Sequence, residues 1–120
     1  MNTKICTDVD QSKKLIELGI DVNTADMCHR NTYSNNNFRF LPCADKAREP
    51  ITGDILAWSL SALLNIINTN YYTTLYHDGV AWNIDIIHHD NVKEKHSVYA
   101  NTPVDACVDM IEKLHEQKLL

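Results

Sequence analysis

The stretch that decides the fold lies in the second half of the chain and reads Tyr71-Tyr72-Thr73-Thr74-Leu75-Tyr76-His77-Asp78-Gly79-Val80-Ala81-Trp82-Asn83-Ile84-Asp85-Ile86-Ile87. Two runs rich in β-branched and aromatic residues flank Asp78-Gly79, a pair that favours a two-residue type I′ turn. The sequence therefore predicts a β-hairpin. A two-residue turn sets a definite register, with His77 opposite Val80, Leu75 opposite Trp82 and Thr73 opposite Ile84.

The second strand of this hairpin has one apolar side and one mixed side. The apolar side holds Val80, Trp82, Ile84 and Ile86. Alternation of this kind indicates a sheet that is covered on one face and open on the other, because successive strand residues point to opposite faces. After a polar turn at 88–94, Lys95–Ala100 is predicted to return as a third strand.

Three helices are predicted around this sheet. The first runs from Val9 to Leu18, with Thr7 or Asp8 as its cap and Gly19 after its end. On it Val9, Leu15, Ile16 and Leu18 share an apolar arc. The second runs from Ile55 to Ile67 behind Asp54, with Trp58 at the border of a narrow polar strip. The third starts at Thr102-Pro103, and its apolar side holds Val104, Cys107, Val108, Ile111 and Leu114.

The segment between the first two helices is polar. Asn31–Asn37 is predicted to be a loop, and Phe38–Leu41 a short strand ended by Pro42. We therefore predict an α+β fold over residues 1–120 as a single domain. Its core element is a three- to four-stranded antiparallel sheet, a meander, covered on one face by helices.

Composition limits the functional classes. The 120 residues carry 11 Lys+Arg against 16 Asp+Glu, a net charge of -5, which argues against a nucleic-acid partner because such proteins usually display a basic patch. Met1–Cys6 leads into charged residues without an apolar segment, so we expect no export signal, no membrane association and a cytoplasmic location. The four cysteines are then expected to be reduced, and mostly buried.

The order of elements also resembles a known group of sequences. A first helix ending in Leu15-Ile16-Glu17-Leu18-Gly19 is followed by Ala57-Trp58-Ser59-Leu60-Ser61-Ala62-Leu63-Leu64, then by a hairpin and by Asn101-Thr102-Pro103-Val104-Asp105-Ala106. This order resembles small uncharacterised proteins of prophages and mobile elements in gut anaerobes. That group often has proline where this chain has Leu56. The resemblance implies an origin in mobile DNA and a cytoplasmic location, and it implies no site residue.

Two chemical sites are considered. His88, His89 and His96 are candidate metal ligands, since zinc takes imidazole ligands, although neighbouring strand residues point to opposite faces. Cys28, next to His29, and Cys43 are candidate thiol nucleophiles, which would require a base placed beside the sulfur in space. Neither site has a recognised motif spacing. No cofactor is expected.

The open face of the predicted hairpin is the candidate interaction surface. The predicted register places Tyr72, Thr74 and Tyr76 beside Asp85, Asn83 and Ala81. Exposed tyrosines can anchor a protein partner or stack on bases. We therefore predict a non-enzymatic protein-interaction module that binds a protein partner or forms a homo-oligomer. Two alternatives stay open, a small metal- or thiol-dependent enzyme and a single-strand nucleic-acid binder that uses Tyr72 and Tyr76.

Overall fold

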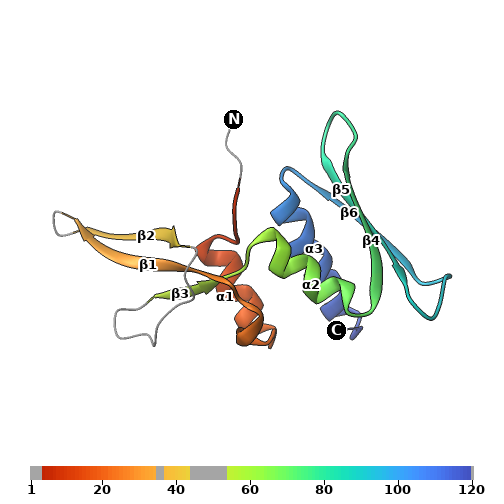
Figure 1. Cartoon of the computed structure of the whole chain (residues 1–120), viewed down its shortest axis with the longest axis horizontal. Helices are drawn as coiled ribbons and strands as arrows, with labels where there is room; N and C mark the ends of the chain where they lie inside the picture. The colour runs from red at the N-terminus through yellow and green to blue at the C-terminus, as the bar shows by residue number, and fades with distance from the viewer. Residues whose placement is uncertain (1–3, 35–36, 44–53, 120) are drawn as a thin grey trace. The chain divides into compact units, whose positions relative to one another are not determined.

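The computed structural model describes residues 4–34, 37–43 and 54–119 of the chain (Figure 1). It has the predicted α+β class, with antiparallel sheets and helices. In chain order the elements are α1 (Val9–Glu17), the 3₁₀ turn η1 (Val22–Thr24), β1 (Met27–Ser34), β2 (Asn37–Cys43), β3 (Ile55–Ala57), α2 (Leu60–Asn68), β4 (Tyr71–His77), β5 (Trp82–His88), β6 (Lys95–Ala100) and α3 (Pro103–Glu116).

The chain divides into two compact units. One comprises Cys6–Ala62, and the other comprises Leu63–Leu120 together with Met1–Ile5. Each unit contains one three-stranded antiparallel sheet, in the orders β2-β1-β3 and β4-β5-β6. The prediction of a single domain over residues 1–120 stays a prediction. No helix in the described ranges has the length and apolar character that crossing a membrane requires.

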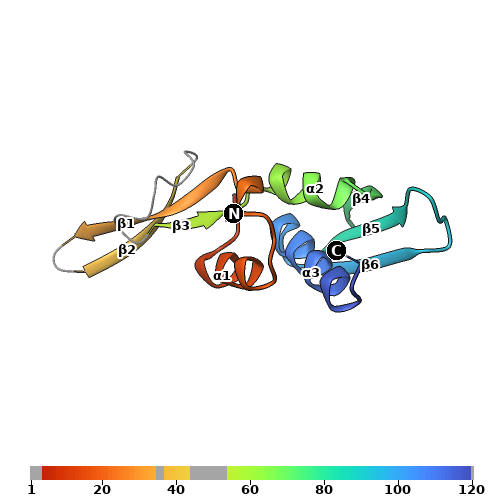
Figure 2. The ribbon, with the colours of Figure 1, turned by 90° about the horizontal axis from the view of Figure 1, so that it is seen from below.

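The sheet β4-β5-β6 is the predicted meander (Figures 1 and 2). Its third strand has the predicted bounds, Lys95–Ala100. Helix α3 packs against β5 and β6 and covers one face. On that face Ile84 and Ile86 are buried, as the alternation of β5 predicts. The prediction of a sheet covered on one side is confirmed.

The register of the hairpin differs from the prediction by two residues. His77 pairs with Trp82, Leu75 with Ile84 and Thr73 with Ile86. The turn is longer because the Asp78 carboxylate accepts hydrogen bonds from the amides of Val80 and Ala81, at 2.9 and 2.8 Å. Aspartate commonly makes such local turns.

A shift of two residues leaves every strand side chain on its predicted face, because the side-chain period of a strand is two. Val80 is the exception. It was expected on the buried face, yet it lies in the turn and is 89% exposed. Gly79, beside it, has a φ of +95°, a left-handed conformation that glycine adopts without steric cost.

The Asp78 turn makes the hairpin sensitive to acid. The hydrogen bonds from the Ala81 and Val80 amides lower the pKa of Asp78 to about 2, below the usual value of an aspartate. A lowered folded-state pKa means that this carboxylate stabilises the fold above about pH 4 and loses that effect as the pH falls toward 2. Asp78→Asn should therefore flatten the dependence of the urea midpoint on pH between about pH 5 and pH 2.5. Asp90→Asn serves as the control, and equal slopes for wild type and Asp78→Asn would contradict the prediction.

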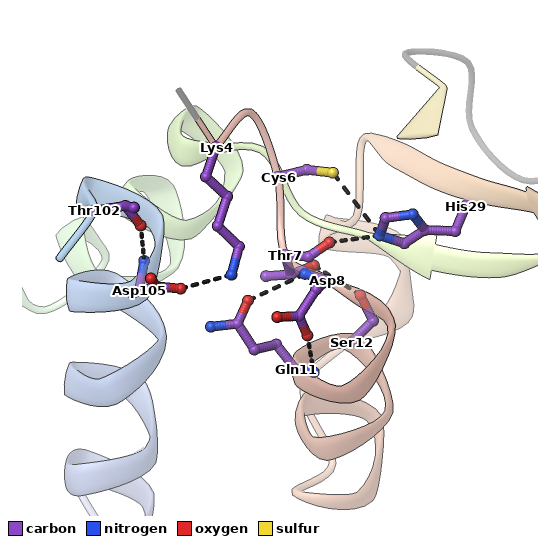
Figure 3. A network of polar contacts seen from close by, with 9 residues as sticks. All are labelled: Lys4, Cys6, Thr7, Asp8, Gln11, Ser12, His29, Thr102 and Asp105. Atoms are coloured by element: carbon purple, nitrogen blue, oxygen red, sulfur yellow. Dashed lines mark hydrogen bonds and ion pairs between the residues drawn. The ribbon is translucent and has the colours of Figure 1, made fainter. Parts of the chain in front are cut away.

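Helix α3 follows its sequence signals closely. Thr102 is the N-cap, its hydroxyl accepts the Asp105 amide at 3.0 Å, and Pro103 is the first helical residue. The Asp105 carboxylate also pairs with the Lys4 ammonium at 2.6 Å (Figure 3). The five predicted core positions, Val104, Cys107, Val108, Ile111 and Leu114, are all buried.

The sheet β2-β1-β3 is where the sequence prediction fails most. Asn31–Asn37 was expected to be a loop, but β1 extends to Ser34 and β2 starts at Asn37, while residues 35–36 lie outside the described part. The strand predicted at Phe38–Leu41 is the middle of β2, which continues through Pro42. Proline is tolerated there because β2 is an edge strand.

The second helix, predicted over Ile55–Ile67, is wrong in its first five residues. Ile55–Ala57 forms β3, in which Ala57 pairs with Met27 of β1, and α2 begins only at Leu60. Trp58, expected at a polar border, is fully buried. The main chain at Trp58 and Ser59 is hydrogen-bonded to segments distant in the sequence. Thr7 and Trp58 exchange hydrogen bonds, and the Asp26 carboxylate accepts a hydrogen bond of 2.8 Å from the Ser59 amide. These tertiary partners override helix propensity.

Helix α1 starts at Val9 as predicted and ends at Glu17, one residue before the predicted Leu18. Asp8 is its N-cap in a full capping box with Gln11 (Figure 3), and Gly19, with a φ of +87°, follows the C-cap Leu18. Leu15 is fully buried, but Ile16, assigned to the same apolar arc, is 41% exposed. The buried side of α1 is therefore narrower than predicted.

Candidate interaction surface

The outer face of the sheet β4-β5-β6 carries the candidate interaction surface. The register aligns its side chains in three rows across the strands. These rows are Tyr72–Ile87–Lys95, Thr74–Asp85–Ser97 and Tyr76–Asn83–Tyr99. We call this set the outer face. All five predicted surface residues, Tyr72, Thr74, Tyr76, Asn83 and Asp85, belong to it.

Large side chains stand exposed at both ends of the outer face. Tyr72 is 67% exposed and Tyr99 74% exposed, while Tyr76 and Ile87 are 42% and 37% exposed. The row between them, which contains Thr74 and Ser97, holds only small or acidic side chains. Tyrosine offers a large contact area at a low cost in conformational entropy, which makes such residues good anchors in interfaces.

The charges on the outer face nearly balance. Lys95 is its basic residue and Asp85 its acidic residue. Asp85, by its charge first and by a hydrogen bond, raises the pKa of the Tyr76 hydroxyl. Single-strand nucleic-acid binding needs a basic groove beside the aromatic residues, so this balance favours a protein partner over a nucleic acid.

The four remaining residues of the outer face were missing from the predicted set, and they are Ile87, Lys95, Ser97 and Tyr99. The signal for Tyr99 was in the sequence, because Lys95–Ala100 was predicted as the third strand. What was lacking was the register of that strand against β5, which pairs Tyr99 with Asn83. The turn between β5 and β6 sets that register, and its polar residues do not specify one turn type.

The opposite face of the same sheet gathers two of the three candidate metal ligands. The ring of Tyr71 lies edge-on to His88, with centroids 5.2 Å apart, and to His96 at 6.2 Å. The Tyr71 hydroxyl donates a hydrogen bond to the Glu94 carboxylate, and Nε2 of His96 lies 3.6 Å from the same carboxylate oxygen. These four residues, Tyr71, His88, Glu94 and His96, form the inner-face cluster.

Contacts within the inner-face cluster shift the pKa of two of its members, Tyr71 and Glu94. Burial, followed by the hydrogen bond to Glu94, raises the pKa of Tyr71 to about 12. The hydrogen bond from Tyr71, followed by the charges of His88 and His96, holds the pKa of Glu94 below its usual value. Tyr71 therefore stays a neutral donor and Glu94 a charged acceptor over the physiological pH range, which suits a structural hydrogen bond.

The third candidate ligand, His89, lies apart from this cluster. Its ring stacks at a tilt on Tyr72 of the outer face, with centroids 4.4 Å apart. The structure thus does not bring His88, His89 and His96 together, because consecutive residues at the end of a strand point to opposite faces. Across residues 4–34, 37–43 and 54–119 no group of three or more His, Cys, Asp or Glu side chains is placed to hold a metal ion.

The candidate thiols are arranged differently from the prediction. Cys28 is buried and lies opposite Cys43 in the register of β1 and β2, whereas its sequence neighbour His29 points to the other face of the strand. The thiol nearest to His29 is that of Cys6, with Sγ 4.0 Å from Nε2 (Figure 3). Sequence adjacency therefore did not identify the thiol that lies beside His29, because Cys6 comes from a distant segment, which forms an isolated bridge with Ser59.

The geometry around His29 does not make it a base for Cys6. Its Nε2 lies 2.6 Å from the carbonyl oxygen of Thr7, which can only accept, so Nε2 carries a proton that it donates there (Figure 3). A protonated Nε2 has no lone pair for the thiol proton. Both side chains are also buried, at 4% and 7% exposed, which leaves a substrate no access. Elsewhere, burial raises the pKa of Cys107 to about 12, typical of an inert thiol in the core.

No protein-family model, curated protein or solved structure matches this chain. The candidate surface therefore rests on the geometry of the chain itself. Of the sites considered, the outer face is the one in which the structure brings all the predicted residues together.

Proposed function

We propose that this chain is a small, non-enzymatic protein-interaction module whose outer face binds a protein partner. The observation that carries the proposal is the exposure of Tyr72, Tyr76, Tyr99 and Ile87 on one strand-formed face. Exposed aromatic residues that share one face, with small polar residues between them, are typical of protein-binding surfaces. The sheet already holds these residues in place, so binding would lose little conformational entropy of the main chain.

The cytoplasmic location and the origin in mobile DNA belong to the same proposal. They are supported by the resemblance to prophage-associated sequences. The burial of Cys6, Cys28 and Cys107 is compatible with a reducing compartment. An enzymatic role has less support, because the three histidines are split between two faces and His29 does not act as a base for Cys6.

The proposal is tested by photo-cross-linking in cells that naturally carry the gene. A benzophenone amino acid replaces Tyr99 on the outer face or, as a matched control, Val92, which is 70% exposed in the turn between β5 and β6. We expect the Tyr99 position to give a protein adduct that the Val92 position does not give. In the purified complex, Tyr99→Ala should weaken binding of that partner by about tenfold or more, as for interface tyrosines.

Two results would overturn the proposal. One is a set of adducts that is the same from both positions, and the other is no adduct from Tyr99. A nucleic-acid adduct at Tyr99 in place of a protein would favour the nucleic-acid alternative.

A further inference from the structure

The free edge of β4 differs from the other sheet edges in the described part of the chain. Among the strands of residues 4–34, 37–43 and 54–119, β4 pairs only with β5, and its residues Tyr71–Tyr76 include no charge, proline or glycine. Natural proteins usually protect edge strands with charged residues, with proline or by keeping the strands short. The other edge strands follow this rule, because β2 contains Arg39 and Pro42, β3 has three residues, and β6 begins with Lys95.

The hydrogen bonds fix which main-chain groups of β4 face this free edge. The Asn70 carbonyl accepts the His89 amide, so the main chain of Asn70 faces β5. Main-chain groups alternate sides along an antiparallel strand, so Tyr72, Thr74 and Tyr76 bond to β5. The amide and carbonyl groups of Thr73 and Leu75 therefore point to the free edge. Both residues are partly exposed.

β4 is also complementary to itself. If a second copy pairs with it in antiparallel orientation about Thr74, Thr74 lies opposite Thr74 and Tyr72 lies opposite Tyr76. Thr73 then lies opposite Leu75, and the two residues exchange both main-chain hydrogen bonds. Cross-strand Thr–Thr and aromatic–aromatic pairs are among those that stabilise sheets. The absence of charge from Tyr71 to Tyr76 means that no like charges face each other.

We propose that two copies of this chain associate through β4, with a two-fold axis at Thr74, and form one continuous six-stranded antiparallel sheet. The pairing supplies hydrogen bonds to the Thr73 and Leu75 main-chain groups, which pair with no described strand, and it removes an edge that would otherwise invite aggregation. It also joins the two outer faces, so that tyrosines from both copies line one surface. The dimer does not require the outer face to bind another protein, so each proposal can fail without the other.

The first test is the mass of the untagged full chain in solution, by light scattering and native mass spectrometry. We expect twice the chain mass of 13.7 kDa. Thr74→Lys would place two ammonium groups opposite each other at the axis and should raise the dissociation constant by at least about tenfold. Ser97→Lys is the matched control, because Ser97 lies in the same row of the outer face but on β6, and it should stay dimeric.

The second test measures the register between the two β4 strands by disulfide cross-linking. Opposed residues of a non-hydrogen-bonded antiparallel pair lie about 4.5 Å apart at Cα, close enough for a disulfide. Diamide should therefore link Thr74→Cys to itself, whereas Tyr72→Cys should link only to Tyr76→Cys when the two variants are mixed. Wild type treated in the same way shows any background from the native cysteines.

The outcomes separate the possibilities. A wild-type chain that is monomeric at about 100 μM overturns the dimer. A dimer that Thr74→Lys leaves unchanged, or that links Ser97→Cys as readily as Thr74→Cys, overturns the β4 interface. A monomer whose β4 edge binds an extended peptide of another protein would also overturn it, in favour of a different occupant.

Discussion

Trp58→Ala should lower the free energy of unfolding by about 3–5 kcal/mol, the usual cost of removing a large aromatic side chain from a core. Trp58 is fully buried, and its indole Nε1 donates a hydrogen bond of 2.9 Å to the Thr24 hydroxyl. Its main chain also joins Thr7, through the amide to Oγ1 at 3.1 Å and the carbonyl from the Thr7 amide at 2.9 Å. Truncation leaves a cavity where three segments meet.

The measurement is urea unfolding followed by far-UV circular dichroism and by the fluorescence of Trp82. Trp58→Phe is the matched control, because it keeps much of the ring volume and loses the bond to Thr24. Trp58→Phe should lower the free energy of unfolding by clearly less than Trp58→Ala does. A loss below about 1 kcal/mol for Trp58→Ala would contradict the burial of this residue, since that is the range of surface substitutions.

Ile84→Ala should lower the free energy of unfolding by about 2–5 kcal/mol. Ile84 is fully buried at the centre of β5, paired with Leu75 on one side and Val98 on the other, on the face that α3 covers. Alanine removes most of the apolar volume of the side chain. The rigid pairing on both sides limits how far the sheet can relax into the space.

Ile87→Ala provides the control within the same strand. Ile87 has the same side chain, but it lies on the outer face and is 37% exposed. Its replacement should lower the free energy of unfolding by about 1–2 kcal/mol, less than at Ile84, because over a third of its surface is already in water. Equal losses at the two positions would contradict this difference in burial, and a larger loss at Ile87 would mean that the faces of β5 are assigned the wrong way round. Urea unfolding of both variants, at one pH and salt concentration, decides between these outcomes.

The candidate surface was predictable from the sequence in its faces but not in its register. Alternation within β5 assigns Asn83 and Asp85 to the outer side. The register shift of two residues keeps Tyr72, Thr74 and Tyr76 on that same side, because the side-chain period of a strand is two. The Asp78 carboxylate determines the length of the turn, because it accepts hydrogen bonds from the Val80 and Ala81 amides. These bonds favour a longer turn over the predicted two-residue turn. Tyr99 joined the surface only through the pairing of β6.

The chemical sites were less predictable, because they depend on contacts between distant segments. Cys28 and His29 are neighbours in sequence and point to opposite faces. Cys6 meets His29 from 23 positions away. Likewise Glu94, which was not a candidate, lies between Tyr71 and His96 because the turn after β5 folds back. No pattern within a few residues of the sequence predicts contacts between side chains from such distant segments.

By itself, the sequence determined the elements whose signals are local: the capped ends of α1 and α3, the apolar side of α3, the α+β class and the alternating faces of the hairpin. Capping, periodicity and side-chain alternation act within a few residues, so they can be read from the chain. Tertiary structure alone decided that Ile55–Ala57 is a strand and that residues 31–34 belong to β1. Those segments take their conformation from partners far along the chain, whose main-chain hydrogen bonds outweigh a local preference of a few tenths of a kcal/mol per residue.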